Sequence, residues 1–325
     1  AFPEEYGGGG FGEVGYCLMQ EEIARGCMST ATFIGAHQSI GANTIYIGGN
    51  EEQKKQYLTP LAKGEKIGAF CLTEAQAGSD SFNVRTRAKL DGNEWVINGE
   101  KLWITNGGIA DIVSVFARTE KGISAFIVET NTPGYHAGPA EKKMGIRGST
   151  TNAITFDNVR VPKENLLGKR GDGFKQMLKT LDGGRLSIAA MGLGGAQGAL
   201  ELGIKYAKER SQFGKPIGEF QANAFKLADC AMLVEAARNL LYKACWLADN
   251  GGPYGKEAAM AKLYCSEVMR TVVWHAQQIH GGYGLMKEYP IERFYRDQRL
   301  LEVGEGTSEI QRIVIARHLG LGKII

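Results

Sequence analysis

Several features that would assign this chain to other protein classes are missing from its 325 residues. No apolar run is long enough to span a bilayer, and no signal peptide opens the chain, so we expect no membrane span and no secretion. Lysine and arginine form no cluster, and the net charge is only +3, which argues against nucleic-acid binding. The six cysteines lack metal-ligand spacing, so we predict no metal site and reduced thiols in a cytosol-like compartment.

The pattern of apolar residues changes twice along the chain. Residues 12–66 read as helical, with Val14, Leu18 and Ile23 at amphipathic spacing and Asn50 as an N-cap before a polar run. Short strand-like segments follow, and the pattern is helical again from residue 173. We therefore predict an α+β protein with domains at 1–66, 67–169 and 170–325; a hydrophobic content of 43% can fill their cores.

The middle part has the features of a small β domain. Asp91-Gly92-Asn93 separates residues 87–90 from 94–98, which is typical of a hairpin, and Asn98-Gly99 is expected to begin the next turn. Further strands are predicted at 67–72, 113–118, 123–129 and 153–156. Too few helices lie between these segments for a parallel sheet.

The last part contains three long helical segments, at 173–209, 220–249 and 255–279. With a helix after Glu305 they would make a four-helix bundle. The glycine-rich run at 191–196 lowers helix propensity, and we predict that it allows close approach of another helix or of a ligand.

A glutamate near the C-terminus is flanked by two glycines. Residues 300–303 read as extended, and the run 308–311 fits a capping box with Ser308 as the N-cap. Glu305 therefore lies on an elbow between two glycines, where a flat ligand can approach the backbone. It is a candidate general base; the alternative is a solvated turn residue.

Three more motifs accompany this elbow. They are residues 68–80 (GAFCLTEAQAGSD), 103–107 (WITNG) and 278–297, which begins QIHGGYGL. In this order and at this spacing, the four motifs resemble the signatures of the acyl-CoA dehydrogenase family. The resemblance covers nearly the whole chain.

The resemblance implies a three-part fold: an N-terminal helical domain, a small β-barrel or sandwich, and a C-terminal four-helix bundle. Residues 1–8 resemble a loop well inside other members, so we expect the first two helices of the N-terminal domain to be absent here. The resemblance also implies FAD as cofactor, an acyl-CoA substrate, electron-transfer flavoprotein as acceptor, and a homotetramer built as a dimer of dimers. The implied compartment is the bacterial cytoplasm or the mitochondrial matrix.

Residues from all four motifs would contact FAD, together with residues 209–214 and 220–221, which resemble the part of the family that binds the adenine and pyrophosphate. The resemblance places residue 278 and the turn at 281–282 against the FAD of a neighbouring subunit. The hydroxyls of Thr73 and Thr105 suit a flavin edge, Trp103 offers a flat face, Ser79 can donate to a phosphate, and Arg210 can bind pyrophosphate. For each of these polar groups alone, a capping or solvated role is the alternative. The implied cofactor-binding set is Phe70, Leu72, Thr73, Gly78, Ser79, Trp103, Ile104, Thr105, Arg210, Gln212, Phe213, Phe220, Gln221, Gln278, Gly281, Gly282, Thr307 and Glu309.

A second set would contact the acyl-CoA. Arg185 is expected near the phosphate-bearing part of CoA and Asp182 near another polar group; an intrahelical Asp–Arg pair is the alternative. The implied substrate-binding residues are Ser79, Leu181, Asp182, Arg185, Gly304 and Gly306.

The resemblance implies α,β-dehydrogenation of the thioester to a trans-2-enoyl-CoA. Glu305 would take the α-proton while FAD takes the β-hydride, and the Glu305 N–H with a ribityl hydroxyl would stabilise the enolate. A free glutamate has a pKa of about 4.3, so desolvation must raise the pKa of this base. Some members carry the base at the positions of residues 184–186, but Gly184 and Arg185 leave Glu305 as the sole candidate.

Two other functions stay open. An acyl-CoA oxidase would be reoxidised rapidly by O2, and a flavin-binding scaffold protein would show no bleaching of its flavin by substrate.

Gly304 stands where many straight-chain members have Tyr. We therefore expect room for a branched, cyclic or short dicarboxylic acyl group, unless Leu181 or Tyr283 fills the space.

Overall fold

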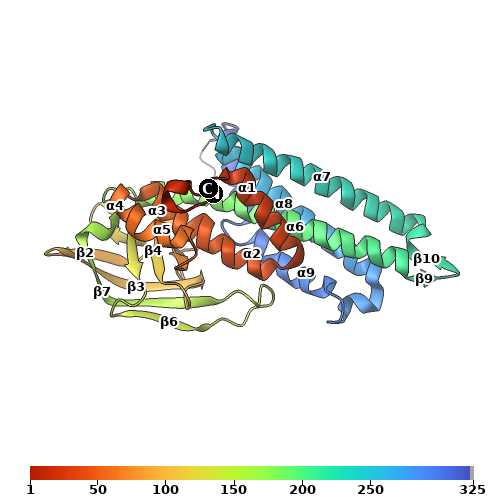
Figure 1. The fold of residues 1–325 in the computed structure, drawn as a ribbon, viewed down its shortest axis with the longest axis horizontal. Helices are drawn as coiled ribbons and strands as arrows, with labels where there is room; N and C mark the ends of the chain where they lie inside the picture. Colours follow the sequence, from red (N-terminus) through yellow and green to blue (C-terminus); the bar gives the residue numbers. More distant parts are fainter. Residues whose placement is uncertain (323–325) are drawn as a thin grey trace. The chain divides into compact units, whose positions relative to one another are not determined.

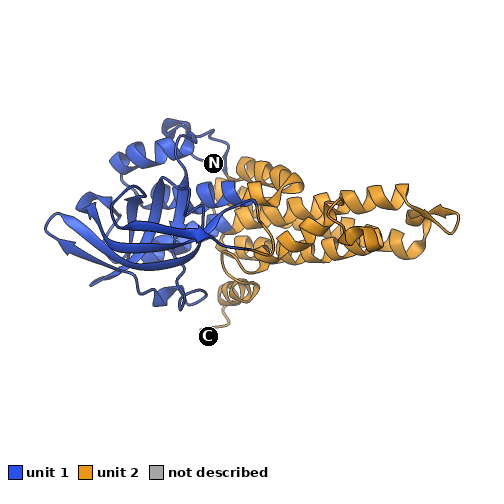
Figure 2. Cartoon of the chain, turned by 90° about the horizontal axis from the view of Figure 1, so that it is seen from below, with its two compact units in different colours: residues 1–12, 32–142, 148–184 blue, residues 13–31, 143–147, 185–325 orange. Residues whose placement is uncertain are grey.

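The computed structural model describes residues 1–322 of the chain, which form two compact units (Figure 2). Unit 1 contains residues 1–12, 32–142 and 148–184, and unit 2 contains residues 13–31, 143–147 and the chain from 185 onward. Helices α2 (Met28–Gly35) and α6 (Gly173–Glu209) contribute residues to both units. A sheet dominates unit 1 and helices dominate unit 2, so the predicted α+β class is confirmed.

Unit 1 is built on an eight-stranded, mostly antiparallel sheet (Figure 1). The strand order is β6-β7-β3-β2-β4-β5-β8, and β1 pairs with β4 in parallel. The hairpin predicted at Asp91-Gly92-Asn93 joins β2 to β3, with Gly92 at a φ of 59°. The strands are β1 Gly68–Cys71, β2 Arg87–Asp91, β3 Glu94–Thr105, β4 Ile112–Thr119, β5 Gly122–Glu129, β6 Tyr135–Ala140, β7 Thr151–Pro162 and β8 Leu166–Leu167.

The turn predicted at Asn98-Gly99 is wrong. Strand β3 continues through both residues, and its pairing with β7 shifts register between Ile97 and Gly99. Gly99 has a φ of 149°, and a Cβ there would lie 2.5 Å from Oγ1 of Thr86. The glycine therefore permits an irregularity inside a long strand, not a reversal of the chain.

Short helices cover the apolar cluster on one side of this sheet. They are α3 (Asn43–Gly48), α4 (Glu51–Gln53) and α5 (Thr59–Ala62), with π-helical turns at Ala36–Ala42 and Lys54–Leu58. Ile45 and Leu58 pack in one cluster with Phe70 and Phe116 of the sheet. The predicted N-cap at residue 50 is confirmed, because the Asn50 side chain accepts a bond from the backbone N–H three residues on.

Unit 2 consists mainly of helices (Figure 1). The part of α6 in this unit runs alongside α7 (Gln221–Asp249) and α8 (Gly255–His280), and all three predicted long helices are confirmed. A small hairpin of β9 (Ser211–Gln212) and β10 (Lys215–Pro216) connects α6 to α7. The remaining helices are α1 (Gly12–Gly26), α9 (Ile291–Asp297) and α10 (Ser308–His318).

Glycines of α6 allow α1 to contact it through its backbone. A Cβ on Gly194 would lie 2.0 Å from the carbonyl oxygen of Glu21, and a Cβ on Gly198 would lie 2.4 Å from that of Arg25. Neither position has room for a side chain. The prediction that glycines near residues 191–196 permit a close helix approach is therefore confirmed.

The amphipathic face predicted for α1 is wrong. Leu18 is 50% exposed, and the buried residues are instead Tyr16, Cys17, Gln20, Glu21 and Ala24. Glu21 is buried because Arg238 and Tyr242 of α7 both bond to its carboxylate. A charge neutralised by another helix cannot be recognised from the periodicity of its own helix.

The segment before Glu305 is helical, not extended. Residues Gln298–Glu302 form a 3₁₀ turn, so the predicted extended segment is wrong. The N-cap of α10 is Thr307, whose hydroxyl accepts from the N–H of Ile310 at 3.3 Å. Ser308 lies inside the helix with a buried hydroxyl, so the predicted capping box is also wrong. The glycine-flanked elbow before a helix is confirmed.

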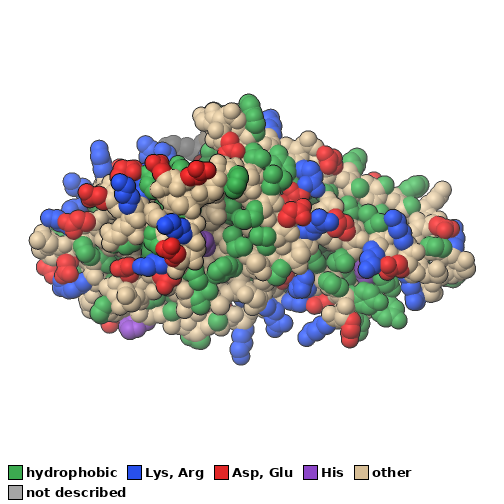
Figure 3. Space-filling view, in the orientation of Figure 1, with side chains coloured by type: hydrophobic (Ala, Val, Ile, Leu, Met, Phe, Trp, Pro, Cys, Tyr) green, Lys and Arg blue, Asp and Glu red, His purple; other side chains and the backbone are tan. Residues whose placement is uncertain are grey.

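Surface charges of both signs are mixed on the face shown in Figure 3. Within residues 1–322, no helix combines the length and the apolar character needed to cross a membrane. The same residues contain no group of three His, Cys, Asp or Glu side chains that could hold a metal ion.

Candidate active site

The elbow at Glu305 is held by side chains from two helices. Glu305 has a left-handed φ of 52°, which a residue with a side chain rarely adopts. The carbonyl oxygen of Gly306 accepts hydrogen bonds from Nζ of Lys262 at 2.6 Å and from Nε2 of Gln311 at 2.9 Å. Gln311 also donates to the carbonyl of Glu305 at 3.3 Å. The backbone is therefore fixed at the residue that carries the carboxylate.

The Glu305 carboxyl group lies in an environment that favours its protonated form. Its Oε2 atom is buried and has no hydrogen-bond partner within residues 1–322. Burial raises the pKa of Glu305 to about 7, although the positive charges of Lys262 and Arg185 oppose this rise. A carboxyl group with a pKa near neutrality can hold or release a proton under physiological conditions.

Lys262 on α8 has no exposed surface. Burial lowers the pKa of its ammonium group to about 8; the charge of Glu305 opposes this change and that of Arg185 adds to it. Sequence reasoning missed Lys262. The signal was available, because this lysine falls among Ala258, Ala259 and Cys265 on the face of α8 that the helical period predicts to be buried.

Arg185, predicted to bind the phosphate-bearing part of CoA, is only 5% exposed. Its charge lowers the pKa of both Glu305 and Lys262. The burial of Arg185 and its effect on the pKa of Glu305 favour an electrostatic role for Arg185 at the Glu305 carboxyl group.

The two glycines of the elbow differ. A Cβ on Gly304 would lie 3.4 Å from Cδ1 of Leu300, which is ordinary contact, so a Cβ atom can be accommodated there. Gly306 has a φ of 93°, and a Cβ there would lie 2.7 Å from Nε2 of Gln311. Gly306 is therefore required by the backbone, whereas Gly304 is not.

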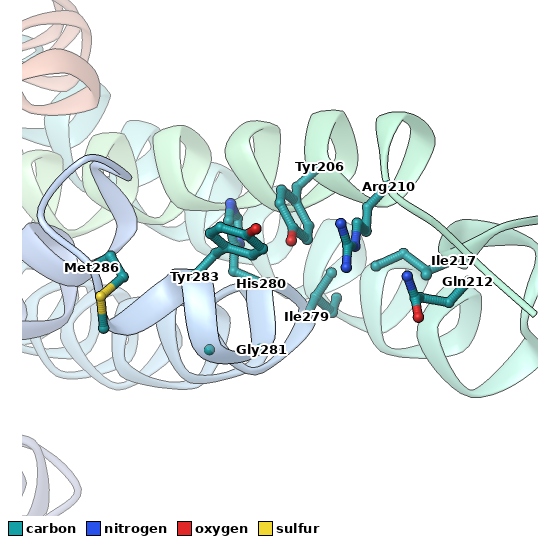
Figure 4. Close-up of a pocket in the computed structure, with 10 residues that line it drawn as sticks. Tyr206, Arg210, Gln212, Ile217, Ile279, His280, Gly281, Tyr283 and Met286 are labelled. Atoms are coloured by element: carbon teal, nitrogen blue, oxygen red, sulfur yellow. The ribbon is translucent and has the colours of Figure 1, made fainter.

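A second group of predicted residues lines a cleft of about 540 Å³ within unit 2 (Figure 4). Tyr206 of α6 and Arg210, which directly follows α6, project into it, and Tyr206 stacks on His280 at 4.3 Å between ring centroids. The Arg210 guanidinium lies 5.6 Å from the ring centroid of Tyr283. Four residues predicted to bind FAD come together in this cleft: Arg210, Gln212, Gly281 and Gly282.

Other predicted residues of unit 2 lie outside the set that lines this cleft. Phe213 is 94% exposed, and its ring lies 6.1 Å from that of Phe220. Gln221 and Gln278 are exposed. In α10, Thr307 is occupied as the N-cap, and Glu309 is exposed in the first turn.

Unit 1 brings together another part of the predicted set. The N–H of Leu102 donates to the carbonyl of Thr73 at 2.8 Å, which joins the segment after β1 to the end of β3. Trp103 follows with a left-handed φ of 57° and an indole that is 62% exposed. The remaining predicted residues are Phe70, Leu72 and Ile104, which are buried, Thr105, which is half-buried, and Gly78 and Ser79, which are exposed.

A buried ion pair supports this part of unit 1. Nζ of Lys101 donates to the carboxylate of Glu74 at 2.8 Å and to the carbonyl oxygens of Leu72 and Phe116. Burial raises the pKa of Glu74, but the bonds from Lys101 outweigh this effect and lower it to about 2. Sequence reasoning missed both residues, because neither Glu74, after β1, nor Lys101, in β3, gives a sign of its partner in the sequence.

Two groups of donors, each within one unit, suit different parts of FAD. Unit 1 offers the hydroxyls of Thr73 and Thr105 with an exposed indole between them in sequence, which matches a flat, neutral flavin ring. Unit 2 offers a guanidinium in an aromatic-lined cleft, which matches a charged pyrophosphate. The residues present therefore fit this cofactor.

Comparison with known proteins decides the family. Three family descriptions match in order: "Acyl-CoA dehydrogenase, N-terminal domain" at residues 1–65, "middle domain" at 69–159 and "C-terminal domain" at 171–320. The chain belongs to the acyl-CoA dehydrogenase family. As a member of this family, it is an FAD-dependent oxidoreductase that acts on acyl-CoA.

Relatives of this acyl-CoA dehydrogenase match over nearly its whole length. It is 53% identical to "Probable acyl-CoA dehydrogenase YngJ" of Bacillus subtilis, over 98% of this chain and 85% of the relative. Butyryl-CoA dehydrogenase of Megasphaera elsdenii is 45% identical, with a TM-score of 0.96 over 98% of this chain and 85% of that one. A chain in the structure "Electron transferring flavoprotein of Acidaminococcus fermentans" is 47% identical, with a TM-score of 0.97 and the same coverage.

Proposed function

We propose that this acyl-CoA dehydrogenase oxidises a short acyl-CoA thioester to the trans-2-enoyl-CoA, and that Glu305 is the base. The observation that carries this proposal is the buried, unpartnered carboxylate oxygen of Glu305, with the pKa of the group raised to about 7. At neutral pH a substantial fraction of the group is ionised, and it is a far stronger base than an exposed glutamate. The butyryl-CoA dehydrogenase relative supports a short acyl chain.

The residues of the chain would act as follows. The Glu305 carboxylate removes the proton from Cα of the thioester, and the negative charge moves to the thioester oxygen. The backbone N–H of Glu305 donates to that oxygen. FAD, when bound, supplies the acceptor for the hydride from Cβ. The bonds from Gln311 to the carbonyls of Glu305 and Gly306 hold the elbow so that the base does not reorient during proton transfer.

Two groups of residues would contact the cofactor. Thr73 and Thr105 bind the edge of the flavin, and Trp103 covers a face of the ring. Arg210 in its cleft binds pyrophosphate, with Gln212 beside it, while Gln278 and the Gly281-Gly282 turn contact the FAD of a neighbouring subunit. The remaining members of the predicted set complete the site. Arg185 acts on the charge of the base, and the other predicted substrate residues line the acyl-CoA site.

We also propose a homotetramer arranged as a dimer of dimers. Exposed apolar side chains on α7 support assembly, because Phe225, Met232 and Trp246 are 61%, 65% and 59% exposed. Electron-transfer flavoprotein is the proposed acceptor, supported by the related chain in the structure of that name. The proposed domains are residues 1–66, 67–169 and 170–325. The six free cysteines fit the bacterial cytoplasm or the mitochondrial matrix.

Anaerobic titration with a panel of acyl-CoA thioesters tests this function. The wild type should lose flavin absorbance on mixing with its substrate. Glu305→Gln should keep FAD and fold, but turnover should fall by roughly 10²–10⁴-fold, the contribution of a positioned base. Glu288→Gln, which removes an exposed carboxylate, is the matched control and should behave as the wild type. Comparable turnover in Glu305→Gln would refute the assignment, and rapid reoxidation by air would favour an oxidase.

A further inference from the structure

One buried ammonium group has no place in the proton transfer described above. Lys262 has no exposed surface and lies on the face of α8 that otherwise buries Ala258, Ala259, Cys265 and Ser266. Burying a lysine is costly unless its charge has a partner. The position of this side chain therefore calls for a specific role.

The contact of Lys262 leads directly to the proposed base. Its Nζ donates to the carbonyl oxygen of Gly306 at 2.6 Å, one peptide beyond Glu305. Nε2 of Gln311 donates to the same oxygen at 2.9 Å. The amide of Gln311 is neutral, whereas the ammonium of Lys262 is positively charged. Lys262 therefore brings both a hydrogen bond and a positive charge to this turn.

The charges around Lys262 come from four elements. Glu305 on the elbow, Glu302 in the 3₁₀ turn and Glu309 at the start of α10 act on it with negative charge, and Arg185 of α6 acts with positive charge. Glu302 is already bonded by Arg270 and Arg299. Glu305 is the charged group with the largest effect on Lys262, and Lys262 is the charged group with the largest effect on Glu305.

We infer that Lys262 is a positioning residue for Glu305, whose ammonium fixes the elbow and supplies the charge that keeps the enclosed carboxylate ionised. This inference rests on the proposed role of Glu305 as the base. It makes two separable claims. The bond to Gly306 holds the geometry of the base, and the charge sets the pH at which the base becomes active.

Two variants separate the bond from the charge. Lys262→Met has a similar length and apolar character, so it suits the buried site but removes both contributions. Lys262→Gln removes the charge and keeps an N–H donor. Lys256→Met makes the same chemical change on α8 at a side chain that is 37% exposed, and it is the matched control.

The decisive measurement is the pH dependence of kcat/KM for the FAD-loaded enzyme, whose acid limb reports the ionisation of the base. In both Lys262 variants the acid limb should move up by about one pH unit, with kcat/KM roughly tenfold below the control at pH 6. Lys262→Gln should approach the wild type above pH 9, where the wild-type ammonium itself is neutral. Lys262→Met should stay lower at every pH, because it has also lost the bond.

Uptake of deuterium from D2O at Cα of the acyl-CoA gives a second readout, because it follows proton removal alone. It should show the same displaced acid limb. An acid limb within 0.2 pH unit of the control in both variants, or a loss of activity by the same factor at every pH, would overturn the inference. Glu305→Gln is measured alongside. If that variant stays active, the proposed base is wrong; if it is inactive while the Lys262 variants keep the wild-type profile, only the role of Lys262 is wrong.

Discussion

Replacing Glu305 with Gln should raise the free energy of unfolding above that of the wild type, and this gain should be larger at pH 8 than at pH 5. The pKa of Glu305 is about 7 in the folded protein, against 4.5 for an ordinary glutamate. Between these two pH values the folded state keeps its proton while the unfolded state has lost it. The contribution of this group to stability is therefore fully present below pH 4.5 and is lost as the pH rises through 7.

The size of the effect follows from the same two values. At 1.36 kcal/mol per pKa unit, the difference between 4.5 and about 7 corresponds to about 3 kcal/mol. Glu305 as a whole residue is half-buried although its Oε2 is enclosed, so solvent screens part of this cost. We expect Glu305→Gln to gain roughly 1–3 kcal/mol over the wild type at pH 8 and less than about 1 kcal/mol at pH 5.

Thermal unfolding of the two flavoproteins at pH 5 and pH 8 measures this difference. The melting temperature of Glu305→Gln should exceed that of the wild type by a few degrees at pH 8, because about 1 kcal/mol shifts the transition of a large domain by roughly 2–4 °C. Glu288→Gln should show no such pH dependence, since its carboxylate is exposed to water in both states. Equal melting temperatures at pH 8, or a gap that is the same at both pH values, would refute the reasoning.

Three further substitutions test other parts of the protein. Arg210→Ala removes charge-assisted bonds worth roughly 1.5–3 kcal/mol each, so the purified protein should lose FAD and tetramer together, measured by the flavin-to-protein absorbance ratio and by light scattering. Gly304→Tyr should fold, because its Cβ has 3.4 Å to Leu300, and should lower kcat/KM for a branched acyl-CoA relative to butyryl-CoA at least tenfold. Lys101→Met leaves Glu74 buried without its cation and should cost roughly 3–5 kcal/mol in urea unfolding.

Each of these has a control and a contrary outcome. The control for Arg210→Ala is Lys243→Ala, which removes an exposed cation from α7 and should keep FAD. A monomeric Arg210→Ala protein with full FAD occupancy would contradict the link between FAD binding and assembly. Val303→Tyr adds the same ring one residue earlier, at a 51% exposed position, and should leave the substrate ratio unchanged. An unchanged ratio in Gly304→Tyr would exclude that position from specificity. Lys89→Met makes the same change at an exposed lysine and is the control for Lys101→Met. Equal stability of the two variants would contradict the predicted cost of leaving Glu74 without its cation.

Local chemistry made much of the fold predictable. The hairpin at Asp91-Gly92-Asn93 and the N-cap at Asn50 depend on residues that are neighbours in sequence, and both were predicted correctly. The long helices show the helical period over more than twenty residues, so their bounds were predicted within one or two residues.

The errors have two sources. At α10 the source is local, because Gln311 donates to the carbonyls of the elbow instead of completing a capping box with Ser308. Elsewhere a distant partner decides. Lys262 is a charged residue on the buried face of α8. Its burial is explained by its bond to the carbonyl of Gly306, 44 residues further along the chain. The candidate base itself was found from its motif, but its electrostatic environment could be described only with the fold in hand.

The packing of α1 has a consequence for how the protein is made. Glu21 must bond to Arg238, which lies 217 residues further along the chain. At a synthesis rate of roughly 5–20 residues per second, the ribosome needs roughly 10–40 s to supply that partner. α1 lacks the glycine face of α6 until that helix has been synthesised, and it lacks the cation of α7 for the whole interval. The first helix of unit 2 therefore reaches its native environment only after α7 has been synthesised.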